Sequence, residues 1–110
     1  MYADPGGGSE GGLTDLSFTP RVFSPSGSFA DDEIRIGFML GRSGSVTAKV
    51  YNRAGRLVKE LASGLAANAG VNLLRWDGRD SDGIEVPDGL YLVTVDALGE
   101  TQTSTLAVVR

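Results

Sequence analysis

The sequence contains neither cysteine nor histidine among its 110 residues. Without cysteine, disulfides, thiolate zinc sites and thiol catalysis are excluded. Without histidine, the chain lacks the side chain that most often acts as general base and as transition-metal ligand. We therefore expect a protein that is not an enzyme and that needs no cofactor.

Basic clusters and long apolar runs are also missing. The ten Lys and Arg residues are scattered and the net charge is −4, so we expect no nucleic-acid partner. No apolar run reaches the length of about 18 residues that a membrane span requires, so we expect no membrane insertion. Residues 1–5 lack the basic and apolar regions of a signal peptide. If the chain is exported, its signal must lie on a longer precursor.

Glycine, by contrast, is abundant at one end of the chain. Five of the sixteen glycines lie within residues 6–12. A polar, Gly-rich stretch cannot bury enough apolar surface to offset the entropy of ordering. We predict a flexible linker over residues 1–12 and one domain over residues 13–110.

The domain shows a period-two pattern typical of β-strands. Ile34, Ile36, Phe38 and Leu40 alternate with other residues, as expected of a strand buried on one face. Similar patterns and turn signals predict strands over 17–23, 33–40, 45–51, 56–61, 71–77, 90–97 and 103–109. Pro20 assigns the first of these to a sheet edge or a bulge. About seven short strands at this spacing indicate an all-β, immunoglobulin-like sandwich.

Two local features refine this prediction. Leu57, Leu61 and Leu65 also have a helical spacing, but the flanking Gly55 and Gly64 favour a strand followed by a loop. In Asn52-Arg53-Ala54-Gly55, the order Asn-x-x-Gly predicts a type I turn closed by a left-handed residue. We therefore expect a positive φ at Gly55.

Three sequence blocks together resemble a known family. They are the turn with its flanks (50–58), the Trp-Asp-Gly-Arg-Asp segment (74–83) and the Pro-Asp-Gly-Leu-Tyr segment (87–93). In this order and spacing they resemble the Ig-like domain named after the flagellar hook-capping protein, over roughly residues 17–110. The residues that carry the signature are Gly55, Trp76, Asp77, Gly78, Gly89 and Tyr91.

The end of the chain is similar to a second group, the C-terminal sorting domains of proteins exported by the type IX secretion system. Its closing strand contains Leu106, Val108 and Val109 and ends at Arg110. The insert at 77–87 fits the hook-capping type better. The resemblance implies a non-catalytic C-terminal module of a larger exported bacterial protein, outside the cytoplasm, that meets a protein partner or the export machinery. We expect the closing strand to lie at a sheet edge open to β-augmentation, with Leu106 and Val108 contributing to the core.

Asp77, Asp80 and Asp82 precede Gly83 and suggest a calcium loop. Gly78 stands where such a loop needs an acidic residue, and no Glu occurs six residues after Gly83. The alternative is that these Asp residues cap turns through their own backbone. We predict turn capping and no bound metal.

The aromatic residues bear on the alternative function, a carbohydrate-binding or spacer module of a secreted hydrolase. A sugar platform needs exposed, coplanar rings. Trp76 is in phase with the apolar Leu74 and is therefore expected in the core. Tyr51 is expected opposite the apolar face of its strand, and Tyr91 is the remaining candidate. Carbohydrate thus remains a possible ligand, although the sequence shows no row of aromatic residues.

Overall fold

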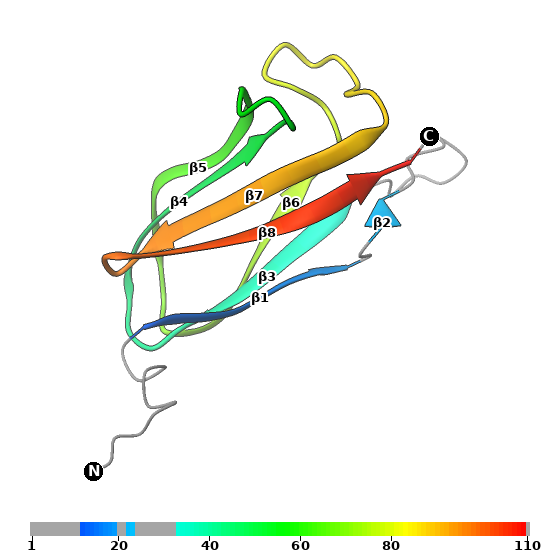
Figure 1. The fold of residues 1–110 in the computed structure, drawn as a ribbon. Coiled ribbons are helices and arrows are strands. Elements are labelled where there is room, and N and C mark those ends of the chain that lie inside the picture. Colours follow the sequence, from blue (N-terminus) through cyan, green and yellow to red (C-terminus); the bar gives the residue numbers. More distant parts are fainter. Residues whose placement is uncertain (1–11, 20–21, 24–32, 110) are drawn as a thin grey trace.

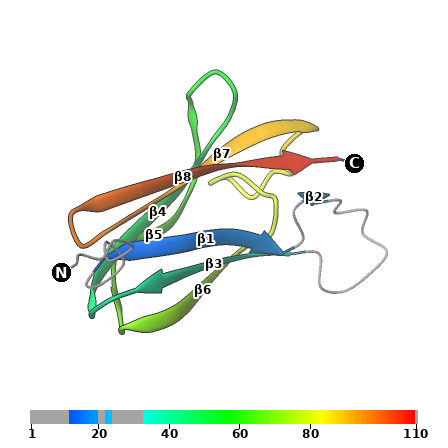
Figure 2. The same cartoon turned by 60° about the horizontal axis from the view of Figure 1, so that its bottom comes forward.

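The computed structural model describes residues 12–19, 22–23 and 33–109, which form two facing β-sheets (Figures 1 and 2). Within these ranges no helix is long and apolar enough to cross a bilayer. The strands are β1 (Leu13–Thr19), β2 (Val22–Phe23), β3 (Ile34–Leu40), β4 (Gly44–Tyr51), β5 (Leu57–Ala67), β6 (Gly70–Trp76), β7 (Gly89–Ala97) and β8 (Glu100–Val108).

One sheet has the order β1-β3-β6 and the other has the order β2-β8-β7-β4-β5. All neighbouring strands are antiparallel except β2 and β8, which are parallel. Figure 2 shows the smaller sheet beneath the larger one. The predicted all-β, immunoglobulin-like sandwich is confirmed.

The core lies between the sheets and follows the alternation seen in the sequence. In β3 every second residue, from Ile34 to Leu40, is buried, and β4 and β7 follow the same rule. Period-two burial places one face of each strand in the core and the other in solvent. The largest fully buried side chains are Trp76, Ile34, Ile36, Leu106, Val46, Val50, Val93, Val95 and Val108.

The first and fourth predicted strands differ from the structure. The segment predicted as one strand over 17–23 forms two, β1 and β2, which belong to different sheets, each at an edge. The strand predicted to end at Leu61 continues to Ala67, so the loop predicted there is wrong. The β4–β5 pairing shifts register between Val46 and Ala48, and Gly64 has a φ of 66°. Such bulges let a strand absorb extra residues without ending.

The expected position of the closing strand is also wrong. β8 lies between β2 and β7, because Val22 pairs with Ala107 and Phe23 with Val108. The N-terminal part of the chain, having left the smaller sheet after β1, thus covers the end of β8. Leu106 and Val108 are buried in the core, as expected.

Edge strand β1 is covered by side chains from β8. The β1–β3 register shifts between Thr14 and Ser17, and Asp15 has a φ of 59°. The amide of Gln102 accepts a hydrogen bond from the Leu16 N–H and donates one to the Leu13 carbonyl, both at 3.2 Å. Glu100 accepts from the Leu13 N–H at 2.8 Å. These bonds join the two sheets along this edge.

The predicted linker over residues 1–12 lies, apart from Gly12, outside the described residues. The Gly12 carbonyl accepts a hydrogen bond from the Gly41 N–H at 2.8 Å. The boundary between linker and domain therefore stays a prediction.

Replacing Gln102 should weaken the connection between the sheets. In Gln102→Leu, the Leu13 carbonyl and Leu16 N–H lose their partners, and we expect a loss of about 1–3 kcal/mol in the free energy of unfolding. Urea denaturation followed by circular dichroism measures this loss. Thr103→Val, at an exposed position of the same strand, is the matched control. Equal stability of the two variants would contradict this role of Gln102.

Candidate functional site

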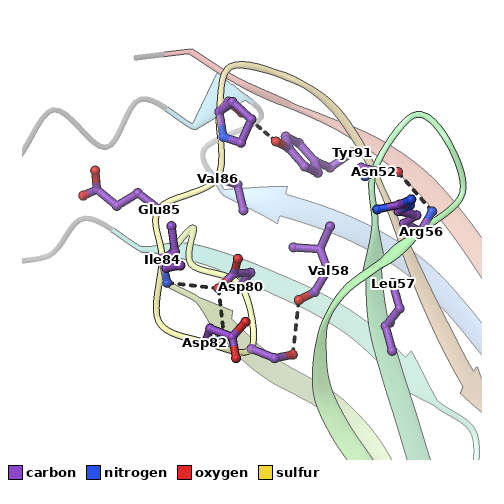
Figure 3. A pocket seen from close by; sticks show the side chains of 12 residues that line it. Asn52, Arg56, Leu57, Val58, Asp80, Asp82, Ile84, Glu85, Val86 and Tyr91 are labelled. Carbon is purple, nitrogen blue, oxygen red and sulfur yellow. Dashed lines mark hydrogen bonds between the residues drawn. The ribbon is translucent and has the colours of Figure 1, made fainter.

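A hollow lies at one end of the sandwich, between the turn after β4 and the loop before β7 (Figure 3). Its volume is about 410 Å³. We call it the end pocket. It is lined by Asn52, Arg56, Leu57, Val58, Asp80, Ser81, Asp82, Ile84, Glu85, Val86, Pro87 and Tyr91.

The turn on one side of the end pocket is fixed by Asn52. Its backbone carbonyl accepts from the Gly55 N–H at 3.0 Å, and its side-chain Oδ1 accepts from the N–H groups of Ala54 and Arg56. Gly55 has a φ of 84°, the positive value that the Asn-x-x-Gly order predicts. A side chain here would be strained, since left-handed backbone favours glycine.

The loop on the other side, residues 77–88, folds as a miniature hairpin. The Val86 N–H donates to the Gly78 carbonyl at 2.9 Å, and the Asp80 N–H donates to the Ile84 carbonyl at 2.8 Å. Arg79 bridges the two arms, donating to the Gly83 carbonyl at 3.1 Å and lying 3.6 Å from the Glu85 carboxylate. The loop therefore has a defined shape.

Two aromatic residues from the core hold this loop at its ends. The Trp76 indole N–H donates to the Arg79 carbonyl at 2.9 Å, and the Tyr91 hydroxyl donates to the Pro87 carbonyl at 2.6 Å. Their rings meet edge to face with centroids 5.8 Å apart, a favoured aromatic geometry. The Tyr91 bond is the tyrosine corner of immunoglobulin-like folds, in which a tyrosine hydroxyl bonds backbone a few residues upstream.

The tip of the loop is attached to the edge of the larger sheet. The Ser81 N–H and hydroxyl both donate to the Val58 carbonyl in β5, at 3.1 and 3.2 Å. Ser81 and Val58 both line the end pocket, so this contact forms part of its wall. The pocket wall is thus anchored on β5, β6 and β7.

The end pocket combines exposed apolar and charged side chains. Ile84 and Leu57 are 62% and 53% exposed, and both line the pocket. Arg56, Asp82 and Glu85 add charges of both signs and are exposed as well. Such a mixture of exposed apolar and charged side chains suits contact with another macromolecule.

Two of the three acidic residues considered as calcium ligands, Asp77 and Asp80, bond to the backbone of the loop. For Asp82, turn capping stays a prediction. Asp77 accepts from the Arg79 N–H at 3.1 Å, and Asp80 accepts from the N–H groups of Asp82 and Ile84 at 2.9 and 3.0 Å. These are the Asx bonds that the capping hypothesis requires. Among the residues that the structure describes, no three His, Cys, Asp or Glu side chains form a group able to hold a metal ion.

The signature residues predicted from the sequence gather around this end of the molecule. Trp76, Gly78 and Tyr91 are buried, whereas Asp77 is exposed and Gly89 begins β7. The residues of the closing strand separate into two environments: Leu106 and Val108 are in the core and Val109 is exposed. Arg110 lies outside the described residues.

Sequence reasoning missed the residues that form the pocket wall. Ile84 is the one strongly apolar residue between Gly78 and Glu85, and an isolated Ile in a polar loop was the available signal. The contact between Ser81 and Val58 joins residues 23 positions apart. No local pattern announces such a contact.

A family model described as the FlgD Ig-like domain matches residues 24–101. The chain belongs to the FlgD Ig-like domain family. The matched residues of this FlgD Ig-like domain include the Asn52 turn, Trp76, the loop and Tyr91. Residues 102–110, which contain most of β8, lie beyond the match.

Individual relatives agree with this family. The basal-body rod modification protein FlgD of Salmonella typhimurium is 40% identical over 52 residues, which are 47% of this FlgD Ig-like domain chain and 22% of the relative. The chain thus spans about a fifth of that relative's length. The crystal structure of FlgD from P. aeruginosa has a TM-score of 0.53 and 29% identity, over 68% of this chain and 61% of that chain.

A third protein shares the fold alone. PorZ is described as an essential bacterial surface component of the type-IX secretion system of Porphyromonas gingivalis. It matches with a TM-score of 0.59 and 24% identity, over 86% of this chain and 11% of PorZ. Domains with the fold of this chain therefore occur in FlgD and in PorZ.

Removing the hydroxyl of Tyr91 should loosen the pocket wall. Tyr91→Phe leaves the Pro87 carbonyl without this donor, and we expect a loss of about 1–2 kcal/mol in the free energy of unfolding. Faster amide exchange over residues 78–88 should accompany it. Tyr51→Phe is the control, and hydrogen exchange by NMR is the measurement. Unchanged exchange in Tyr91→Phe would show that the Tyr91 hydroxyl is not needed to hold the loop.

Metal removal tests the function of the acidic residues. We predict that excess EDTA leaves the melting temperature unchanged, because Asp77 and Asp80 already bond backbone N–H groups. A metal that binds only the native state would raise stability in proportion to the logarithm of its concentration. A fall of more than a few degrees on EDTA addition, reversed by calcium, would refute the capping hypothesis.

Proposed function

We propose that this chain is a non-catalytic interaction module of a larger exported bacterial protein, and that it binds a protein partner through the end pocket. The observation that carries the proposal is that hydrogen bonds to Trp76, Tyr91 and Val58 hold the pocket wall in place. Ile84 is exposed on this wall. A rigid surface loses little conformational entropy on binding. Covering exposed apolar side chains with a partner removes them from water, which favours binding.

The relatives support the setting. FlgD is named as a basal-body rod modification protein, and PorZ as a surface component of a secretion system. Both names describe proteins that belong to assemblies at or beyond the cell envelope. We propose the same extracytoplasmic setting for this chain, as the C-terminal part of its precursor.

If the closing strand serves in sorting, only part of it is accessible to a receptor. Because Leu106 and Val108 are buried, a receptor for this end of the chain would contact Val109 and any residues beyond it. Deletion of Leu106–Arg110 would destroy the core, so such a deletion does not test sorting.

The carbohydrate alternative loses two of its three candidate rings. Trp76 and Tyr91 are buried and bonded to the loop, and Tyr51 is half-buried. The aromatic residues that the structure describes do not form an exposed row. A protein partner is therefore favoured over a sugar.

Site-specific photo-cross-linking in the producing cells tests the proposal. A photoreactive residue at Ile84 should give a discrete protein adduct, sensitive to protease added outside the cells. The same residue at Leu65, an exposed position of β5 outside the pocket, should not. Without an adduct at Ile84 the module would be a spacer. If the chain stays inside the cytoplasm, the export proposal is wrong.

A further inference from the structure

The four sheet edges differ in how they are protected. β1 carries a bulge and is bonded by Gln102 and Glu100. β2 has only two residues. β5 has register shifts, a left-handed Gly64 and the Ser81 contact. Bulges, short strands and covering contacts are the usual means by which proteins prevent strand addition.

Among its described contacts, edge strand β6 has such devices only at its start, where Gly70 has a φ of 106° and the Asn72 side-chain amide donates to the Gly70 carbonyl at 3.2 Å. It pairs with β3 at seven consecutive positions, from Ile34 with Trp76 to Leu40 with Gly70, with no register shift. It contains no proline and, before Arg75, no charge. In Figure 2 it forms the outer margin of the smaller sheet. A regular edge of this kind is a template for another strand.

The outer face beside this edge is apolar. Val71 is 79% exposed and Leu73 is 50% exposed, and Met39 on β3 lies opposite Val71. Gly37 lies opposite Leu73, and a Cβ there would stand 4.0 Å from the Leu73 side chain. Leu73 therefore leans over a position without a side chain of its own and still remains half exposed.

The next row of the same face carries two positive charges. Arg35 and Arg75 are directly opposite each other in the β3–β6 register, and both are exposed. Like charges at opposite positions destabilise a sheet. Glu33 compensates for this only in part, because its carboxylate is 3.8 Å from Arg75 and both side chains are well exposed. In a chain of net charge −4, this row is a local concentration of positive charge.

We propose that β6 receives an added β-strand from a protein partner, and that this strand carries a carboxylate beside Arg75 and Arg35 and apolar side chains beside Leu73 and Val71. Side chains on one face of a strand recur every second residue, so an added strand that runs antiparallel to β6 has the recognised sequence acidic-x-apolar-x-apolar. The backbone bonds of the added strand supply affinity, and these three positions supply specificity. The proposal rests on the function as an interaction module but not on the end pocket.

The test uses the labelled peptide fluorescein-Ser-Glu-Thr-Val-Thr-Val-Ser and its counterpart with Lys in place of Glu. Fluorescence anisotropy at low ionic strength measures binding. We expect the Glu peptide to bind about tenfold more tightly than the Lys peptide. The protein variant Arg75→Glu should reverse this preference. Arg53→Glu, the same charge change on the exposed turn, should leave the preference unchanged.

The amide chemical shifts of the protein locate the bound peptide. Shifts confined to β6 and the adjoining part of β3 support the proposal. Shifts around the end pocket would overturn it while leaving the proposed function intact. Equal binding of the two peptides, or no binding of either, would also overturn it. If the peptide binds at β6 but a photoreactive residue at Ile84 gives no cross-link, the end pocket is not the partner site. The proposal for β6 then stands and the one for the end pocket fails.

Sedimentation of the protein without peptide tests the other occupant of this edge. The proposal requires a protein that stays monomeric, in which the β6 amides that do not bond to β3 exchange readily. A concentration-dependent dimer that protects these amides would show that a second copy occupies the edge, and the assignment of an acidic strand would be wrong.

Discussion

The contact between Trp76 and Tyr91 determines much of what this end of the molecule can do. The two rings lie in the core, one at the end of β6 and the other near the start of β7, and each sends its polar atom outward to the same loop. Packing and hydrogen bonding are thereby coupled, because the rings cannot shift without releasing the Arg79 or Pro87 carbonyl. A loop of polar and glycine residues, which has little apolar surface of its own, is held in one conformation by groups that belong to the core. The end pocket exists because this loop is fixed.

The sequence was informative wherever one face of a strand is buried. Alternation located β3, β4, β6, β7 and β8 within a few residues, and the Asn52 turn was readable because its geometry demands glycine at position 55. Prediction from the sequence failed where local patterns carry no information about which strand pairs in the second sheet. Nothing within residues 17–23 tells that Val22 pairs with Ala107, and the bulge at Gly64 lets β5 continue past a signal that resembles a stop. The pocket was missed for the same reason, since Ser81 and Val58 meet only in the folded chain.

The end pocket and the β6 edge would recognise partners through different kinds of interaction. The pocket is a shaped hollow whose walls come from turns, so it would select a partner by side-chain fit. The β6 edge offers backbone groups, and it would accept any extended segment whose charge and apolar pattern suit one face. Arg75 and Trp76 are neighbours in sequence, but one faces solvent and the other the core. The two surfaces are therefore separable by mutation, although the same strand contributes to both.

The parallel pairing of β2 with β8 has a mechanical consequence. β2 follows the N-terminal strand, and β8 closes the described chain, so a pull on the two ends draws these strands in opposite directions along their length. Their hydrogen bonds are then loaded together in shear rather than opened one after another. Resistance to such a pull is set by the rate of unfolding rather than by equilibrium stability. A module anchored at one end and held by a partner at the other would carry part of that load at this short pairing, where Val22 and Phe23 lie beside Ala107 and Val108.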